Sequence, residues 1–270
     1  MTAHMKRLIT AFIAVPLLTG IIWFAPFWVL TIVVLVVALR GLYEFYAMLG
    51  PRVAKTIVFI IYVLTILLFC SLLYKGLFFV SILPLFVMFP LAFFLFSNEK
   101  NYPKSSDFAQ TIIGPFYICI GPFYICLPLI FFLLIAGLDQ GKMWIFFILA
   151  VIFAGDTGSF YVGRHLGKHK LTPISPGKTW EGTVGGLLAN VLSAGIFGLL
   201  FFPSLSLITI MVLAIVIGIS GQVGDLAESL FKRISNIKDS GTVLPGHGGI
   251  LDRIDSLLFA IPVLYLYLSY

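Results

Sequence analysis

Long apolar segments follow one another along almost the whole of this 270-residue chain. A helix needs about 20 apolar residues to cross the hydrocarbon core of a bilayer, and the segments are close to that length or longer. Only 10% of the residues are charged, against about 25% in soluble domains. The sequence therefore predicts an all-α fold, a polytopic integral membrane helical bundle with about nine transmembrane helices. The predicted spans are residues 8–25, 27–49, 54–74, 77–97, 108–138, 143–163, 183–202, 207–232 and 250–270.

Two parts of the chain differ in their polar content. We expect residues 1–140 to form N-terminal transmembrane helices, and residues 141–270 to form C-terminal transmembrane helices with the cytoplasmic loops that carry the catalytic site. The first apolar segment follows Lys6 and Arg7, as a signal peptide would. A second span follows within a few residues, so we expect the first to remain as an anchor.

The basic residues predict the orientation in the membrane, because cytoplasmic loops carry an excess of Lys and Arg. In the nine-span arrangement one side receives fourteen of these residues and the other receives two, with Arg40 inside the second span. We therefore expect a multi-pass protein of the cell membrane whose N-terminus and two polar loops, 164–182 and 233–249, are cytoplasmic. The net charge of +6 does not indicate nucleic acid, because the basic residues lie beside apolar segments, where they meet anionic membrane lipids.

Asp156 is the first polar feature of interest, because it follows the apolar run 145–155. A carboxylate at that depth is costly unless it faces a polar cavity, a cation or a metal. A structural ion pair with Arg164, eight residues further on, is the alternative. Both interpretations remain open from the sequence alone.

Lys178 lies in the segment 175–183, which reads SPGKTWEGT. The run Gly177-Lys178-Thr179 resembles the end of a phosphate-binding P-loop, but that motif requires glycine where this chain has Thr172. What remains is a lysine at a turn before a helix start, where it either contacts a phosphate or is solvated at the interface.

A polar stripe and a pair of aspartates flank the second long loop. Asp225, Glu228, Ser229 and Lys232 recur at helical spacing, which places them on one face. Across the loop, Asp252 and Asp255 stand three residues apart where the last span begins. Carboxylates on two helix ends favour Mg²⁺, which takes oxygen ligands and usually needs only one or two carboxylates besides substrate phosphates. The alternative is that these acids pair with nearby basic residues, which we expect for Glu228, Asp239 and Asp255.

Residues 229–255, SLFKRISNIKDSGTVLPGHGGILDRID, resemble the signature of the CDP-diacylglycerol synthases, also called phosphatidate cytidylyltransferases. The glycine-rich segment around Asp156 and the segment 175–182 are similar to further features of this family, with Gly177 where the family has a first lysine. That departure weakens any role for a lysine pair. The resemblance covers mainly residues 150–270.

The resemblance implies that CTP and phosphatidate react to give CDP-diacylglycerol and pyrophosphate in phospholipid biosynthesis. It implies dependence on Mg²⁺, with or without a second cation, at a site near the cytoplasmic membrane interface. We expect CTP, phosphatidate and membrane lipids as partners. The small residues Gly185, Gly186, Ala189, Gly195 and Gly198 would suit either a homodimer face or internal packing.

The candidate site residues fall into three groups. The expected catalytic residues are Asp225, Asp252, Lys232, Arg233 and His247. His247 would either donate to the departing pyrophosphate or hold the glycine-rich bend. The expected substrate-binding residues are Lys178, Ser229, Lys238 and Arg253, and the expected metal ligands are Asp225, Asp252 and Asp156.

Three other classes of membrane protein have similar substrates or similar acidic residues and are therefore alternatives. A CTP-dependent lipid kinase would release CDP rather than pyrophosphate. A CDP-alcohol phosphotransferase would need an aspartate pattern, D-G-x2-A-R-x8-G-x3-D-x3-D, that this sequence does not contain. An ion-coupled transporter would also place acids inside the membrane, but it more often shows an inverted repeat with broken helices in both halves.

Overall fold

The computed structural model describes residue 12 and residues 16–49, 55–73, 82–96, 118–237, 240–241 and 248–270. These residues are helical almost throughout, and no strand is named among them; Lys170 and Thr179 form an isolated bridge. Residues 16–24 are helical. The further helices are α2 (Phe27–Leu49), α3 (Lys55–Leu73), α5 (Leu85–Phe96), the π-helical turn η3 (Pro122–Cys126), α7 (Leu127–Ala136), α8 (Gly141–Leu166), α9 (Trp180–Phe201), α10 (Leu207–Ile234) and α11 (Leu251–Ser269).

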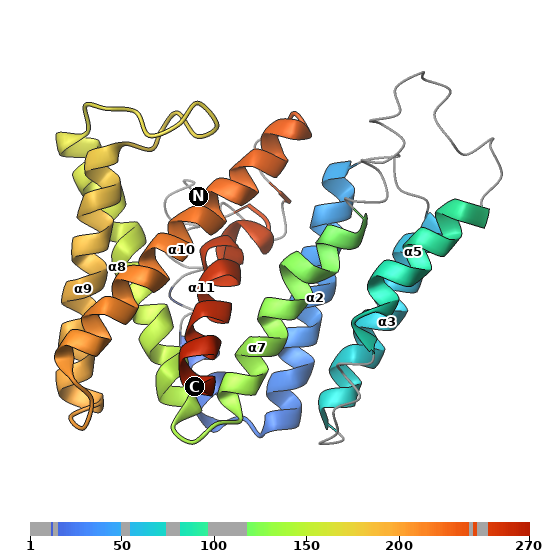
Figure 1. Ribbon diagram of the computed structural model, residues 1–270, viewed down its shortest axis with the longest axis horizontal. Coiled ribbons are helices and arrows are strands. Elements are labelled where there is room, and N and C mark those ends of the chain that lie inside the picture. The colour runs from blue at the N-terminus through green and yellow to red at the C-terminus, as the bar shows by residue number, and fades with distance from the viewer. Residues whose placement is uncertain are drawn as a thin grey trace.

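The predicted all-helical membrane bundle is confirmed. Each of the nine predicted apolar segments contains helix within the described residues. Within the described residues, six helical segments are long and apolar enough to cross a membrane: Phe27–Met48, Lys55–Leu73, Ile118–Ala136, Gly141–Leu166, Trp180–Phe201 and Leu207–Ile234. α9 and α8 lie at one edge of the molecule and α3 and α5 at the other, while α10 runs obliquely past α11 (Figure 1).

Small residues bring α8 and α9 into close contact. A Cβ atom at Gly158 would lie 2.6 Å from Cβ of Ala189, and one at Gly182 would lie 2.9 Å from the carbonyl oxygen of Ser159. Helix pairs in membranes associate through such small-residue contacts, because lipid gives no hydrophobic driving force between helices. This packing sets the ends of α8 and α9 side by side.

Aromatic rings join the N-terminal helix α2 to the C-terminal helices. The ring of Phe231 on α10 lies 5.3 Å from that of Phe45 on α2 and 5.4 Å from that of Tyr124 in η3, centroid to centroid. Tyr124 also meets Phe259 of α11 at 6.1 Å. Such pairs add about 0.5–1.5 kcal/mol each beyond their burial. The cluster fixes α2 against the helices that carry the charged residues.

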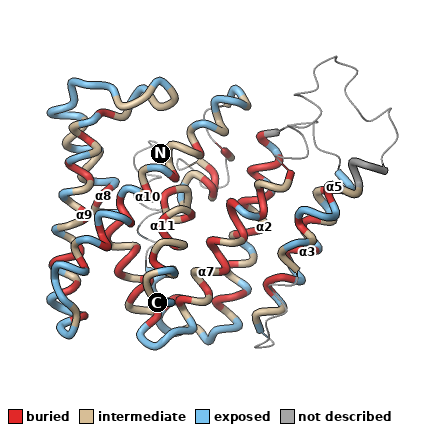
Figure 2. The backbone as a smooth tube through the Cα atoms, in the orientation of Figure 1, coloured by how far each residue is buried: buried red, intermediate tan, exposed pale blue. Residues whose placement is uncertain are grey.

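The outward face of α9 is apolar and exposed, as expected of a surface that meets lipid (Figure 2). Leu188, Leu192, Ile196 and Leu199 are each more than 60% exposed. Its small residues face inward instead: a Cβ at Gly198 would strike Ile210, and one at Gly185 would strike Val162. Packing within the chain therefore accounts for these two glycines, and the homodimer stays a prediction.

The α8–α9 contact gives a first prediction. In Gly185→Ala the new methyl group would lie 2.5 Å from Cβ of Val162, a stiff β-branched side chain, so the two helices must separate. Overpacking of this kind costs about 1–3 kcal/mol. Thermal unfolding in detergent should show the loss. Gly195→Ala on the same helix is the control, because its methyl group would meet only Cε of Met211 at 3.4 Å. Equal stability of the two variants would contradict the packing account.

Candidate active site

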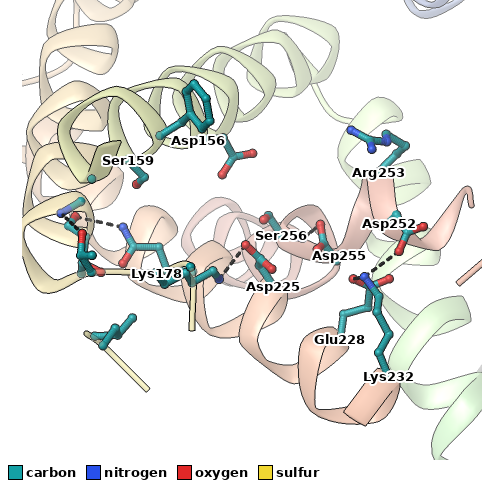
Figure 3. Close-up of a pocket in the computed structure, with 18 of the residues that line it drawn as sticks. Asp156, Ser159, Lys178, Asp225, Glu228, Lys232, Asp252, Arg253, Asp255 and Ser256 are labelled. Carbon is teal, nitrogen blue, oxygen red and sulfur yellow. Dashed lines mark hydrogen bonds and ion pairs between the residues drawn. The ribbon is translucent and has the colours of Figure 1, made fainter. Parts of the chain in front are cut away.

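A cavity of about 860 Å³ lies where α8 ends, α9 begins, α10 approaches its end and α11 begins (Figure 3). Charged, polar and small side chains line most of it. The lining residues of α8 and α9 are Asp156, Ser159, Phe160, Gly163, Arg164, Gly182 and Thr183. The loops contribute Leu171, Gly177, Lys178, Thr179, Gly241 and Gly248. α10 and α11 contribute Gln222, Asp225, Glu228, Lys232, Asp252, Arg253, Asp255 and Ser256.

Backbone hydrogen bonds shape the loop between α8 and α9 and present Lys178 to the cavity. The amide of Leu171 donates to the carbonyl of Lys178, and the amide of Lys178 donates to that of Ser175, both at 3.0 Å. Thr179 then caps α9, since its hydroxyl accepts from the amide of Gly182 at 3.1 Å. A side-chain cap satisfies an amide that the first turn leaves unpaired. The cap starts α9 at Trp180, three residues before the predicted start at residue 183.

Lys178 reaches from this loop to α10. Its Nζ lies 2.6 Å from Oδ2 of Asp225, and both side chains are only partly exposed. Asp225 precedes the end of α10 by nine residues and Asp156 precedes the end of α8 by ten. At 1.5 Å per residue, both carboxylates lie about 14–15 Å from those ends. The cavity therefore extends well below the level at which the helices end.

Lys232 joins two acids at the other side of the cavity. Its Nζ lies 2.5 Å from Oε2 of Glu228 and 2.6 Å from Oδ1 of Asp252. Glu228 is 1% exposed, and its second oxygen, Oε1, is buried without a hydrogen-bond partner in the described part of the chain. Taking a carboxylate out of water is expensive unless an opposite charge lies beside it. The ammonium group of Lys232 meets that requirement for both acids.

Backbone amides of the loop before α11 also donate to the carboxylate of Asp252. The amide of Gly249 donates to Oδ2 at 2.7 Å, and the amide of Ser240 donates to the same oxygen at 3.2 Å. Hydrogen bonds to an ionised acceptor are stronger than those between neutral groups. Asp252 is thus held by the loop as well as by α11.

Asp156 and Asp255 contribute two further carboxylates. Asp156 points from α8 into the space that Asp225 and Asp255 also border (Figure 3). One oxygen of Asp255 accepts from the amide of Ser256 at 2.7 Å. No ion pair joins Asp156 to Arg164 among the described residues, and the guanidinium of Arg164 lies instead 6.0 Å from the ring centroid of Phe160.

The structure does not bring every predicted residue to the cavity. Arg233 donates from Nε to the carbonyl of Ile174 at 3.1 Å, and so ties the end of α10 to the α8–α9 loop. Ser229 and Arg233 are absent from the cavity lining, whereas Arg253 is part of it. Lys238 and His247 lie outside the described residues, as does Asp239.

The oxygen donors suit a hard cation. Four aspartates line the cavity, and Mg²⁺ in phosphate-binding sites usually takes one or two carboxylates together with substrate oxygens and water. Within the described ranges, no three acid, His or Cys side chains gather closely enough to hold a metal by themselves. The donor set therefore fits a Mg²⁺ ion that shares its coordination with a phosphate ligand.

Comparison with known proteins gives the family. The model of the family described as "Cytidylyltransferase family" matches residues 5–270. The chain belongs to the cytidylyltransferase family. The resemblance inferred from residues 229–255 is thereby confirmed.

Curated relatives of the chain carry the name phosphatidate cytidylyltransferase. That of Bacillus subtilis is 46% identical over 141 residues, which cover 52% of each chain. Those of Staphylococcus saprophyticus and Staphylococcus haemolyticus are 45% and 46% identical, over 47% of this chain and 49% of the relative. The chain thus spans about half the length of the curated relatives it matches.

Sequence reasoning missed Gln222, Ser159 and Glu44. Gln222 lines the cavity and donates to the carbonyl of Thr183 at 3.1 Å, and Ser159 lines it one turn beyond Asp156. Glu44 on α2 is 1% exposed and contacts the loop that holds Asp252. The signal for Glu44 was present, since an acid inside an apolar span is rare and usually has a definite partner.

The Lys232 contacts give a second prediction. In Lys232→Met the buried carboxylates of Glu228 and Asp252 lose the cation between them. Breaking a buried ion pair by removing one partner costs about 3–5 kcal/mol, which thermal unfolding in detergent measures. The double variant Lys232→Met/Glu228→Gln should recover part of that loss. Lys168→Met, at an exposed position, is the control, and a shift no larger than in the control would refute the account.

Proposed function

We propose that this chain transfers the cytidylyl group of CTP to phosphatidate, giving CDP-diacylglycerol and pyrophosphate. The observation that carries the proposal is that Lys178 and Lys232 project ammonium groups into one cavity that is also lined by four aspartates. A transfer between two phosphates needs cations to position and neutralise them, with little covalent help from the protein. The printed name of the relatives supports the same reaction.

We further propose that the cavity opens toward the cytoplasm at the membrane interface. Supporting this, the ends of α8 and α10 and the starts of α9 and α11 meet at the cavity. The loops at this end belong to the side that receives fourteen of the Lys and Arg residues in the nine-span arrangement. A water-soluble nucleotide and a bilayer lipid can meet only where a site is open to both phases.

Asp225 and Asp252 are the residues we propose to hold Mg²⁺, each together with phosphate oxygens rather than as one closed set of carboxylates. Asp156, which lines the same cavity, is a further proposed ligand, and a second cation stays a prediction. The carboxylates of Asp225 and Asp252 are paired with lysines, so a divalent ion would replace an ammonium group at the same oxygens. When bound, the ion supplies charge neutralisation for the CTP phosphates.

The lysines then act on the substrates. An ammonium group displaced from its carboxylate remains in the cavity, where Lys178 and Lys232 donate to phosphate oxygens of CTP and phosphatidate. A phosphatidate oxygen bonds to the α-phosphorus of CTP. The bond between that phosphorus and the oxygen that joins it to the β-phosphorus breaks. Pyrophosphate leaves with the electron pair. The nucleophile is already anionic, so the residues need not remove a proton.

Other binding roles follow the sequence prediction. Arg253 lines the cavity at the start of α11 and is suited to bidentate contact with a phosphate. Ser229, Arg233, Lys238 and His247 stay predicted contributors to the site. Membrane lipids and a second copy of the chain stay predicted partners.

Labelled CTP tests the reaction. Purified protein is incubated in detergent with phosphatidate, Mg²⁺ and CTP labelled at either the α- or the γ-phosphorus. The α label should enter the lipid and the γ label should leave in pyrophosphate. Entry of the γ label into lipid would identify a kinase and contradict the proposal. No movement of either label in folded protein would also contradict it and turn attention to ion transport.

The proposed metal ligands give a sharper test. Asp225→Asn and Asp252→Asn should each lower turnover at limiting Mg²⁺ by roughly 100-fold or more, since removal of one group that stabilises developing charge costs about 10²–10³ in rate. Asp139→Asn, at an exposed loop position, is the matched control and should keep normal turnover. Near-normal rates for both cavity variants in correctly inserted protein would rule out the metal assignment.

A further inference from the structure

Glu44 is a buried acid on α2, almost two hundred residues before the loop that it contacts. We infer that Glu44 is a positioning residue, which holds the loop before α11 so that the loop amides fix the carboxylate of Asp252. The inference rests on the proposed function for its effect on turnover. It assigns to the N-terminal part of the chain a direct part in building the site.

Three donors converge on the carboxylate of Glu44. Oε2 accepts from the amide of Leu251 at 2.9 Å and from the hydroxyl of Ser240 at 3.3 Å. Oε1 accepts from Nε of Arg40 at 3.2 Å, one helical turn earlier on α2. Both oxygens are therefore acceptors, which a carboxylate provides and an amide side chain does not.

Glu44 also completes the start of α11. The residue before that helix, Ile250, has no side-chain cap, and a helix start leaves several amides without an internal partner. The amide of Leu251 finds its acceptor in Glu44 instead. A negative charge at this position is further favoured by the helix dipole. A distant helix thus provides the cap that the local sequence lacks.

Two glycines let the loop backbone lie directly against the carboxylate. A Cβ at Gly241 would lie 2.7 Å from Oε1 of Glu44, and a Cβ at Gly249 would strike Oε2 of Glu44 and Oγ of Ser240. No larger residue fits at either place without moving the acid. The contact is therefore one between closely fitted surfaces rather than a single hydrogen bond.

The residues that meet Glu44 also hold Asp252. Ser240 contacts Glu44 through its hydroxyl and Asp252 through its amide. Gly249 packs on Glu44 and donates its amide to Asp252 at 2.7 Å. Asp252 in turn meets Lys232 at 2.6 Å. Displacement of the loop would therefore move a proposed metal ligand and a proposed phosphate donor together.

Hydrogen exchange tests the positioning role without substrate or metal. In Glu44→Gln the amides of residues 240–241 and 248–252 should exchange at least about tenfold faster than in the unaltered protein. The reason is that the loop opens at a lower free-energy cost when it has no hydrogen bonds to a charged acceptor to break. Thr65→Val is the matched control. It removes a buried hydroxyl of α3 that bonds to the carbonyl of Ile61, away from the loop. Unchanged exchange in Glu44→Gln, or equally faster exchange along α2 and α3, would overturn the inference.

Enzyme kinetics provide a second test of the positioning role of Glu44. Loss of a group that orients a metal ligand typically costs about 10–100-fold, so Glu44→Gln should lower kcat by that factor at saturating CTP and raise the Mg²⁺ concentration needed for half-maximal rate. Ser240→Ala, which removes one of the two Oε2 contacts, should do the same to a smaller degree. Normal kcat in Glu44→Gln despite faster exchange would overturn the inference. Failure of the unaltered protein to transfer the α label would refute the proposed function alone, since the exchange experiment stands without it.

Discussion

Buried charge is tolerable among apolar helices only where an opposite charge or several hydrogen bonds compensate it. Two lysines provide most of that compensation here. Lys178 meets Asp225 at 2.6 Å, and Lys232 lies between Glu228 and Asp252. Both lysines come from the end of the bundle where four helices and two loops meet. These ion pairs are what allow the acids to line the cavity.

The same ion pairs make the site responsive to phosphate and metal. Asp225 and Asp252, two of the proposed Mg²⁺ ligands, are each paired with an ammonium group that suits a phosphate oxygen. Binding of a metal–nucleotide complex would therefore exchange one set of charge pairs for another without leaving a buried charge alone. Glu44 lies outside this exchange, because its three donors are a loop hydroxyl, a helix amide and Arg40. It can hold the loop steady while the pairs change.

The sequence predicted those features that depend on local pattern. Apolar runs of spanning length gave the helices, and the helical spacing from Asp225 to Lys232 gave the polar face of α10. Which charged side chains pair with one another could not be predicted, because pairing depends on how helices distant in the sequence pack. Lys178 and Asp225 are 47 residues apart in the sequence and meet only in the fold. The partners of Glu44 could not be predicted for the same reason, since Ser240 and Leu251 follow about two hundred residues later.

Locating CTP on the protein tests the central claim most directly. A structure determined with CTP and Mg²⁺ should place the triphosphate in the cavity between Lys178 and Lys232, with the metal ion on Asp225 or Asp252. Lys178 should then contact a phosphate oxygen in place of Asp225, and Lys232 should contact one in place of Asp252 while it keeps its contact with Glu228. A nucleotide bound outside this cavity, or one that leaves both lysine–carboxylate pairs intact, would contradict the account.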